Sequence, residues 1–280
     1  MPEATAAGLV RVLRPRRGWQ RIDLAELWRY RDLLVALALR DVQVRYKQTA
    51  LGVAWAVIQP LVTMVVFSVL FGQLLNLAQH TDGVPYPIFL FAGLLPWTFF
   101  SATVTASSNA LVNNAAMIQK VYFPRLLMPI AAAGAPLIDY AVASVVLLGM
   151  MAWYGVTVSW PMLLLPALAA STVLPALGVG VLVAGLNVSY RDFRHVVPFL
   201  IQVWFYLTPV LVPVSVAPPR YQWLVHLNPL AGTISAFRSA VLGTPIDLGA
   251  WSVSLASSLG FAAVALAYFS RAERRFADVI

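Results

Sequence analysis

The chain has no cysteine and little charge. Without thiols, it can form no thiolate metal site, disulfide or cysteine nucleophile. Charged residues make up only 11% of its 280 residues, whereas a soluble domain carries about 25%. The three histidines, His80, His195 and His226, lie far apart without metal-ligand spacing, so we expect no metal site. With 60% hydrophobic residues, the composition indicates that water is not the main solvent of this chain.

Catalytic motifs are also missing. No GxxxxGKS or GxxxxGKT sequence is present, so the chain lacks the loop that holds ATP phosphates. No Ser/His/Asp set stands out, and we expect no catalytic residue and no cofactor in this chain. A basic tail over 1–22 has no apolar run with a cleavage site, so we expect no cleaved signal peptide.

Long uncharged stretches predict membrane spans. No charge occurs between Asp82 and Lys120 or between Asp139 and Arg191, and a span needs only about 20 apolar residues. We expect an all-α membrane protein, with a single transmembrane domain over 49–280. Its six spans are placed at about 51–75, 87–112, 126–154, 162–186, 196–213 and 248–270.

The basic residues predict how these spans are oriented. With the N-terminus inside, 17 of the 19 Lys and Arg residues fall in the predicted cytoplasmic segments 1–50, 113–125, 187–195 and 271–280. Cytoplasmic loops are enriched in these residues, so both termini are expected in the cytoplasm. The net charge of +8 then needs no nucleic-acid partner.

Residues 23–48 form a different kind of segment. Apolar residues including Leu27, Trp28, Leu34 and Val35 recur there at helical spacing, although Arg31 interrupts the apolar face. A helix lying in the cytoplasmic interface among membrane lipids fits this pattern. A solvated helix packed on a partner protein is the alternative.

The stretch 214–247 is apolar, but prolines, arginines and a glycine interrupt it. Asn228 can cap a helix that begins with Pro229, and Gly243 suits its end. We interpret 219–243 as two re-entrant half-helices on the outer side, where Arg220 and Arg238 also lie. Such helices need protein or water over their ends at membrane depth. An ordinary surface loop is the alternative.

Polar and aromatic side chains within the spans are candidate channel residues. Four hydroxyls share one face of the second span and either line a polar path or join helices: Thr98, Ser101, Thr105 and Ser108. The small residues Ala176, Gly180 and Ala184 indicate helix packing in the fourth span. Asp139 is the one carboxylate inside a predicted span, with a structural and a transport role both open.

Three segments resemble one family. RDVQVRYKQTALGVAWAVIQP at 40–60, NNAAMIQKVYFPRLLMP at 113–129 and LNPLAGTISAFRSAVLG at 227–243 are similar to signatures of ABC transporter permeases that export polysaccharides and polyol phosphates. The first two are fairly specific together, and the third is weaker alone. Their order and spacing agree with this family over essentially the whole chain.

The resemblance implies a homodimeric permease of the bacterial inner membrane, with two copies of a nucleotide-binding ATPase subunit that binds ATP and Mg. It implies that a short helix at about 114–122 receives the motion of the ATPase. The matching residues are Asn114, Met117, Ile118, Lys120, Val121, Tyr122 and Arg125. It also implies that the outer helices form a gate, which matches Asn228, Pro229 and Arg238 here.

The expected cargo is a lipid-linked polysaccharide, with O-antigen favoured over teichoic acid and capsular polysaccharide. Sugars stack on aromatic rings, so we expect Trp55, Phe67, Trp204 and Tyr206 on spans one and five to line a glycan path. A permease for drugs or small lipophiles shares this architecture and is the first alternative. A secondary transporter should show paired intramembrane charges or an inverted repeat, and the sequence shows neither.

Overall fold

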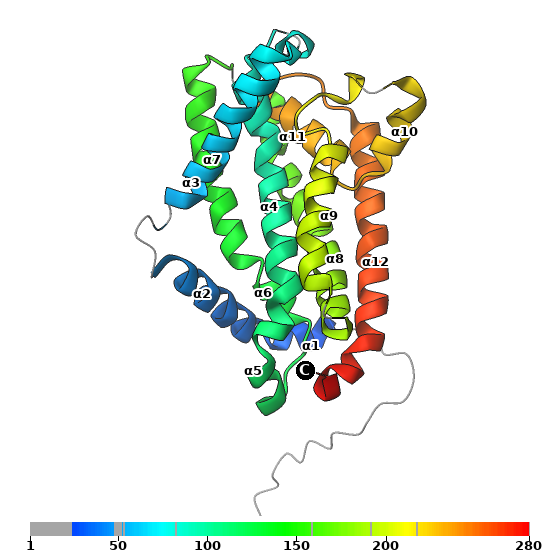
Figure 1. The fold of residues 1–280 in the computed structure, drawn as a ribbon. Coiled ribbons are helices and arrows are strands. Elements are labelled where there is room, and N and C mark those ends of the chain that lie inside the picture. The colour runs from blue at the N-terminus through cyan, green and yellow to red at the C-terminus, as the bar shows by residue number, and fades with distance from the viewer. Residues whose placement is uncertain are drawn as a thin grey trace, which may run out of the picture.

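The computed structural model describes residues 24–47, 52, 54–81, 83–157, 159–190, 192–216 and 218–279. The basic tail expected over 1–22 lies outside these residues. The described part contains helices and no strands (Figure 1). In chain order the elements are α1 (Leu24–Arg29), α2 (Arg31–Lys47), α3 (Ala54–Phe67), η1 (Ser68–Leu74), η2 (Leu77–His80), α4 (Tyr86–Asn113), α5 (Ala115–Lys120), α6 (Leu127–Ala131), α7 (Gly134–Trp153), η3 (Trp160–Leu164), α8 (Leu165–Ser189), α9 (Phe193–Leu207), η4 (Val214–Val216), α10 (Pro219–Leu227), α11 (Ala231–Leu242) and α12 (Leu248–Val279).

Five helical segments in the described residues are long and apolar enough to cross a membrane. They lie close to the expected positions of spans one to four and six. Their bounds are Ala54–Leu74, Tyr86–Asn113, Leu127–Trp153, Trp160–Ser189 and Leu248–Glu273. The chain is therefore a multi-pass membrane protein by the length and composition of its helices.

The span expected at 196–213 is shorter than predicted. Its helix, α9, ends at Leu207, and Pro209 follows two residues later. At ~1.5 Å per residue its 15 residues cover about 22 Å, which is less than the ~30 Å hydrocarbon core. The structure therefore does not confirm a count of six spans. A sixth crossing needs the non-helical chain after Leu207 to continue across.

The centre of the bundle is α4, which packs against α7, α8 and α11. Its buried side chains dominate the larger of two apolar cores, and Ile88, Leu90 and Phe100 are fully covered. The smaller core lies around the junction of α2, α5 and α6 and includes Leu37 and Ile118. Because α3 contributes few buried side chains, it is the most peripheral of the long helices.

Small residues bring α8 close to its neighbours. Ala176 and Ala184 are fully buried, and a Cβ on Gly180 would lie 2.8 Å from the Ser107 Cβ of α4. On the other side, a Cβ on Gly178 would lie 3.1 Å from the Ala262 nitrogen of α12. The packing role predicted for Ala176, Gly180 and Ala184 is confirmed.

The predicted cytoplasmic and outer segments separate to opposite ends of the bundle. Figure 1 shows α1, α2, α5 and the C-terminal end of α12 at the lower end, and η2, α10 and α11 at the upper end. Asn187 near the end of α8 donates a 2.8 Å hydrogen bond to the Ser108 carbonyl, which places 187–190 beside the lower part of α4. The described parts of the four predicted cytoplasmic segments therefore lie at the lower end of the bundle.

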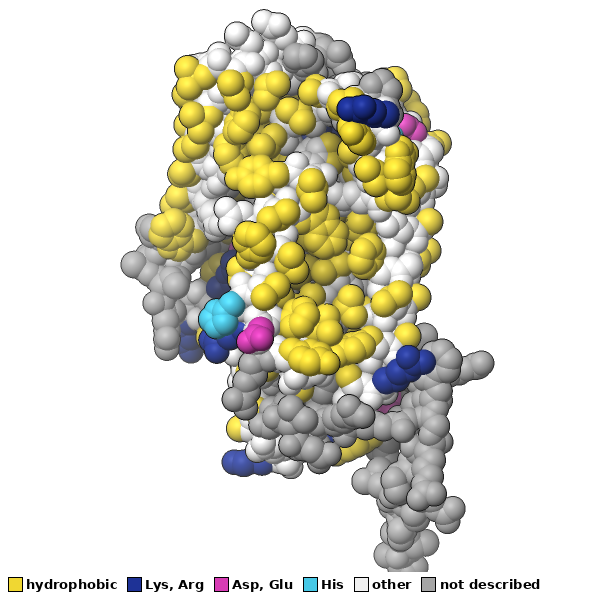
Figure 2. All heavy atoms as spheres, turned by 45° about the vertical axis from the view of Figure 1, so that its right-hand side comes forward, with side chains coloured by type: hydrophobic (Ala, Val, Ile, Leu, Met, Phe, Trp, Pro, Cys, Tyr) yellow, Lys and Arg dark blue, Asp and Glu magenta, His cyan; other side chains and the backbone are white. Residues whose placement is uncertain are grey.

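The surface agrees with this arrangement. Figure 2 shows a broad band of apolar side chains across the middle of the visible face, with most of the visible charged side chains toward the lower end. Over the whole molecule, exposed apolar residues occur on several helices, among them Val62, Val145, Leu200 and Leu259. A surface of this kind is stable in lipid rather than in water.

Candidate functional site

A cavity of about 710 Å³ opens between α3 and the helices α4, α7 and α9. Trp55, Ala56 and Gln59 of α3 form one wall, and the end of α2 closes it at one side. The facing wall comes from the hydroxyl-bearing face of α4, from α7 around Asp139, and from Pro198 and Ile201 of α9. The cavity therefore lies between α3, which has few buried side chains, and α4, which has many.

Three of the four predicted hydroxyls line this cavity: Thr98, Ser101 and Thr105. Each donates to a carbonyl of its own helix, with distances of 3.0 Å to Leu95, 3.1 Å to Thr98 and 2.7 Å to Ser101, respectively. A hydroxyl has one proton and two lone pairs, so these oxygens remain available as acceptors. This wall suits a ligand that brings its own hydroxyl donors.

The other predicted channel residues do not line the cavity, with the exception of Trp55, which is 53% exposed. Ser108 is buried, and Phe67 stacks on Phe205 with ring centroids 5.8 Å apart. Trp204 packs edge-on against the Phe100 ring, while Tyr206 is 63% exposed on the other side of α9. The eight predicted channel residues thus divide between this cavity and other places in the bundle.

Asp139 has two partners that the sequence reasoning missed. Arg45 Nη2 of α2 lies 2.7 Å from its Oδ2 atom, and the Tyr46 hydroxyl donates to its Oδ1 atom. Burial and this hydrogen bond raise the pKa of Tyr46 to about 12, so its hydroxyl keeps its proton. An intramembrane acid calls for a nearby base, and Arg45 could have been proposed on that ground.

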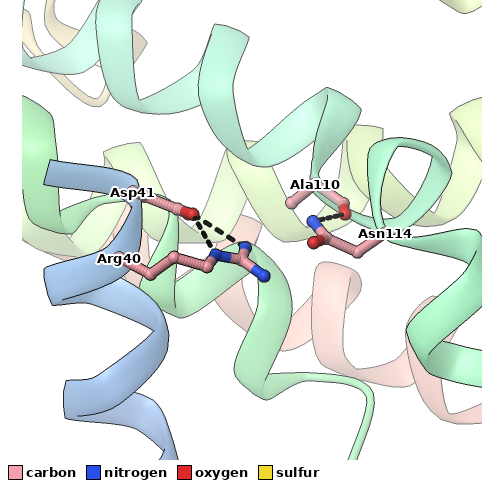
Figure 3. Close-up of polar contacts among 4 residues, drawn as sticks. All are labelled: Arg40, Asp41, Ala110 and Asn114. Carbon is pink, nitrogen blue, oxygen red and sulfur yellow. Dashed lines mark hydrogen bonds and ion pairs between the residues drawn. The ribbon is translucent and has the colours of Figure 1, made fainter. Parts of the chain in front are cut away.

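The segment predicted to receive motion from an ATPase forms the short helix α5. Ile118 is buried in the smaller core, whereas Lys120, Val121 and Tyr122 are exposed at the lower end of the molecule. The Asn114 side chain folds back to donate a 2.7 Å bond to the Ala110 carbonyl at the end of α4. Figure 3 shows this bond together with the pairing of Arg40 and Asp41 on α2. Leu37 of α2 shares the smaller core with Leu111 of α4 and Ile118 of α5, so α2 lies near the junction of these helices.

Arg125 has a different setting from Lys120. Its guanidinium donates to the Glu273 backbone carbonyl of α12, and its own backbone nitrogen donates to the Glu273 carboxylate at 3.1 Å. Arg125 thus ties the chain after α5 to the last helix. The predicted group is therefore divided into a buried anchor at Ile118, an exposed surface from Lys120 to Tyr122, and a tie at Arg125.

The predicted outer helices are present as α10 and α11, which are joined at Asn228. The Asn228 side chain accepts bonds from the Trp204 indole at 3.2 Å and from the Leu230 nitrogen at 3.0 Å. It also donates to the Thr208 hydroxyl at 2.9 Å. Helix α11 begins at Ala231 rather than at Pro229, and Gly243 ends it in the left-handed conformation, as predicted.

Arg238 lies in α11, at the end of the bundle where the sequence placed it, but its side chain is buried rather than exposed. It is only 5% exposed, and its guanidinium donates to the Phe89 carbonyl at 3.2 Å, the Pro209 carbonyl at 3.0 Å and the Val210 carbonyl at 2.8 Å. It also lies over the Phe89 ring. The carbonyls of Pro209 and Val210 follow the end of α9, and Arg238 satisfies them where no helix continues.

Comparison with curated proteins finds permeases of known transport systems. The chain is 29% identical to the O-antigen export system permease protein RfbA of Klebsiella pneumoniae, over 89% of this chain and 95% of that protein. It is also 29% identical to the protein of the same name in Myxococcus xanthus, over 76% of this chain and 82% of that one. The polysialic acid transport protein KpsM of Escherichia coli is 24% identical, over 76% and 83% of the two chains.

A family model extends this agreement across most of the fold. The model for the ABC-2 type transporter matches residues 32–242, from α2 through the end of α11. The matched region contains the cavity, the short helix α5 and the two outer helices described above. This chain belongs to the ABC-2 type transporter family of membrane subunits.

Proposed function

We propose that this chain is the permease subunit of an ATP-driven exporter that moves a lipid-linked polysaccharide, with O-antigen favoured, to the outer side of the bacterial inner membrane. It acts as a homodimer with two copies of an ATPase subunit, which binds ATP and Mg. The exposed surface of Lys120, Val121 and Tyr122 is where the ATPase docks. The N-terminus and C-terminus lie in the cytoplasm, and α9 with the chain after it makes the sixth crossing.

The row of acceptor oxygens in the cavity is the observation that carries this proposal. Thr98, Ser101 and Thr105 commit their protons to α4, so they recognise hydroxyl donors rather than apolar surface. Trp55 supplies an exposed ring in the same cavity. The names of the matched relatives point to the same class of cargo, because they describe O-antigen export and polysialic acid transport.

Export of a drug or small lipophile is the second candidate. The volume of about 710 Å³ lies within the ~300–1,000 Å³ range of pockets for drug-sized ligands. An apolar compound would gain nothing from the hydroxyl row, however, and would leave the acceptors without partners. Teichoic acid and capsular polysaccharide bring the same hydroxyl chemistry as O-antigen and remain alternatives within the proposal.

The test replaces the acceptors without disturbing other helices. We expect the combined variant Thr98→Val, Ser101→Ala and Thr105→Val to reduce surface polysaccharide several-fold in cells that supply the ATPase. The control is Thr63→Val with Ser252→Ala, because both hydroxyls bond to their own helix but are exposed outside the cavity. Equal polysaccharide export by the two variants would contradict the proposal, and faster efflux of a lipophilic dye would favour the second candidate.

A further inference from the structure

The end of α2 and the helix α3 form one wall of the cavity. Arg45 and Tyr46 from α2 line it together with Trp55 and Gln59 from α3. Only Pro60 of α3 is fully buried; Val62, Val65 and Val66 are exposed, while Leu61, Met64 and Phe67 are partly covered by the larger core. A helix with few covered side chains has little packing energy to hold it in place. The position of this wall therefore depends on partly covered side chains of α3 and on the contacts at its two ends.

At the lower end, the contact is polar. Arg45 Nη2 lies 2.7 Å from Asp139 Oδ2, and Tyr46 donates to Asp139 Oδ1, so both carboxylate oxygens of α7 are held by α2. We call Arg45, Tyr46 and Asp139 the clasp. The side chain of Arg45 is 46% exposed and that of Asp139 is 18% exposed. An ion pair with this access to solvent opens far more easily than a fully buried one.

At the upper end, the contacts are apolar. Phe67 stacks on Phe205 of α9, and Gly72 lies against the Tyr86 ring, with only 2.9 Å between a built Cβ and the ring. These close ring contacts hold the upper part of the wall by packing. The wall is thus held by packing at one end and by a breakable pair at the other, with the cavity between them.

The size of the cavity sets a limit on what can enter without movement. A volume of about 710 Å³ accommodates a drug-sized ligand but not a continuing polymer. We propose that Arg45, Tyr46 and Asp139 are positioning residues for transport: the clasp sets the separation of α2 and α3 from α7, and it opens to widen the cavity in each cycle. This inference rests on the proposed export of a polymer.

The test measures access to the cavity and needs no cargo. Because the chain has no cysteine, Ser101→Cys introduces a single thiol in the cavity wall. In the full complex, Arg45→Gln or Asp139→Asn should raise the rate of maleimide labelling at this thiol several-fold, and Tyr46→Phe should raise it less. The exchanged pair Arg45→Asp with Asp139→Arg should return the rate toward that of the intact clasp.

The matched control is the Arg31–Asp32 pair on the same helix. Its atoms lie 3.7 Å apart on exposed side chains, outside the cavity lining, so Arg31→Gln should leave the labelling rate unchanged. Unchanged labelling in both Arg45→Gln and Asp139→Asn would overturn the clasp. That result would leave the choice of cargo untouched, because labelling does not depend on it.

Discussion

The buried position of the Arg238 side chain requires a residue without a Cβ atom at Gly93. The guanidinium of Arg238 reaches the carbonyls after α9 by passing directly over Gly93 of α4, and a Cβ there would overlap its Nη2 atom. The same Cβ would lie 3.1 Å from the Val210 carbonyl oxygen. A side chain as small as alanine therefore forces apart a buried cation and the oxygens that compensate it.

We expect Gly93→Ala to lower the stability of the folded protein by about 1–3 kcal/mol, the usual cost of overpacking a core. Displacing a buried charge from its partners adds to this cost. Gly149→Ala on α7 is the control, because nothing lies within 4 Å of its built Cβ. Thermal unfolding of the two purified variants in detergent checks the expectation, and equal Tm values would contradict it.

In α5 and the chain after it, the proposed docking surface and the contacts that support the bundle involve different residues. Lys120 is exposed, whereas Arg125 holds α12 through the Glu273 backbone carbonyl. A substitution of Arg125 therefore loosens the bundle as well as any coupling, and it is a poor probe of the ATPase interface on its own. Lys120 is the cleaner position for that purpose.

For this reason we expect Lys120→Glu to lower ATPase stimulation and export while Tm stays unchanged. Arg125→Ala should lower Tm as well as export, and Glu273→Gln should do less damage, because the backbone carbonyl that receives the guanidinium remains. Parallel measurements of Tm and ATPase activity in the assembled complex distinguish the two roles. If Lys120→Glu retained full coupling, the proposed docking surface would be wrong.

The end of α9 shows how irregular backbone is supported inside this bundle. Three side chains from other helices bind the chain from Leu207 to Leu211: Asn228, Arg238 and Tyr86, the last through a 2.9 Å bond to the Leu211 carbonyl. Backbone without a regular helix is tolerated at membrane depth only when protein or water satisfies it. This support is what makes a sixth crossing by α9 and the following chain physically reasonable.

Across the whole molecule, the arrangement predicts which positions face which compartment. We expect a single cysteine at Lys120 or His195 to react with an impermeant maleimide only after cells are lysed. A cysteine at Arg220, which is exposed on the opposite end, should react in intact cells with a permeabilised outer membrane. If His195→Cys and Arg220→Cys reacted from the same side, α9 would not complete a crossing.

Long uncharged stretches made the main helices predictable, since few other structures satisfy their backbone in lipid. The two outer helices and the end at Gly243 also followed from proline, asparagine and glycine at known helix-end positions. The early end of α9 was missed because Leu207 to Pro213 is as apolar as a span, although Pro209 disfavours a helix at the residue before it. The sequence could not show that Arg238, Asn228 and Tyr86 bind the chain that follows.

The candidate site was predictable in part. Hydroxyl spacing placed Thr98, Ser101, Thr105 and Ser108 on one helix face, because neighbours on a helix are fixed by its period. The first three line the cavity and Ser108 does not, and their role in transport remains a prediction. The partners of Asp139 lie 93 and 94 residues away along the chain, and no local pattern connects them. Whether the aromatic residues touch a glycan remains a prediction.

The unequal burial of α3 and α4 bears on how such a protein diverges. Nearly every residue in the upper half of α4 is enclosed by other helices, so a substitution there disturbs several neighbours together. On α3, Trp55, Ala56 and Gln59 line the cavity, so their replacement disturbs fewer neighbours. Substitutions on the cavity face of α3 can therefore alter cargo preference at a lower cost to folding than substitutions in the enclosed upper half of α4.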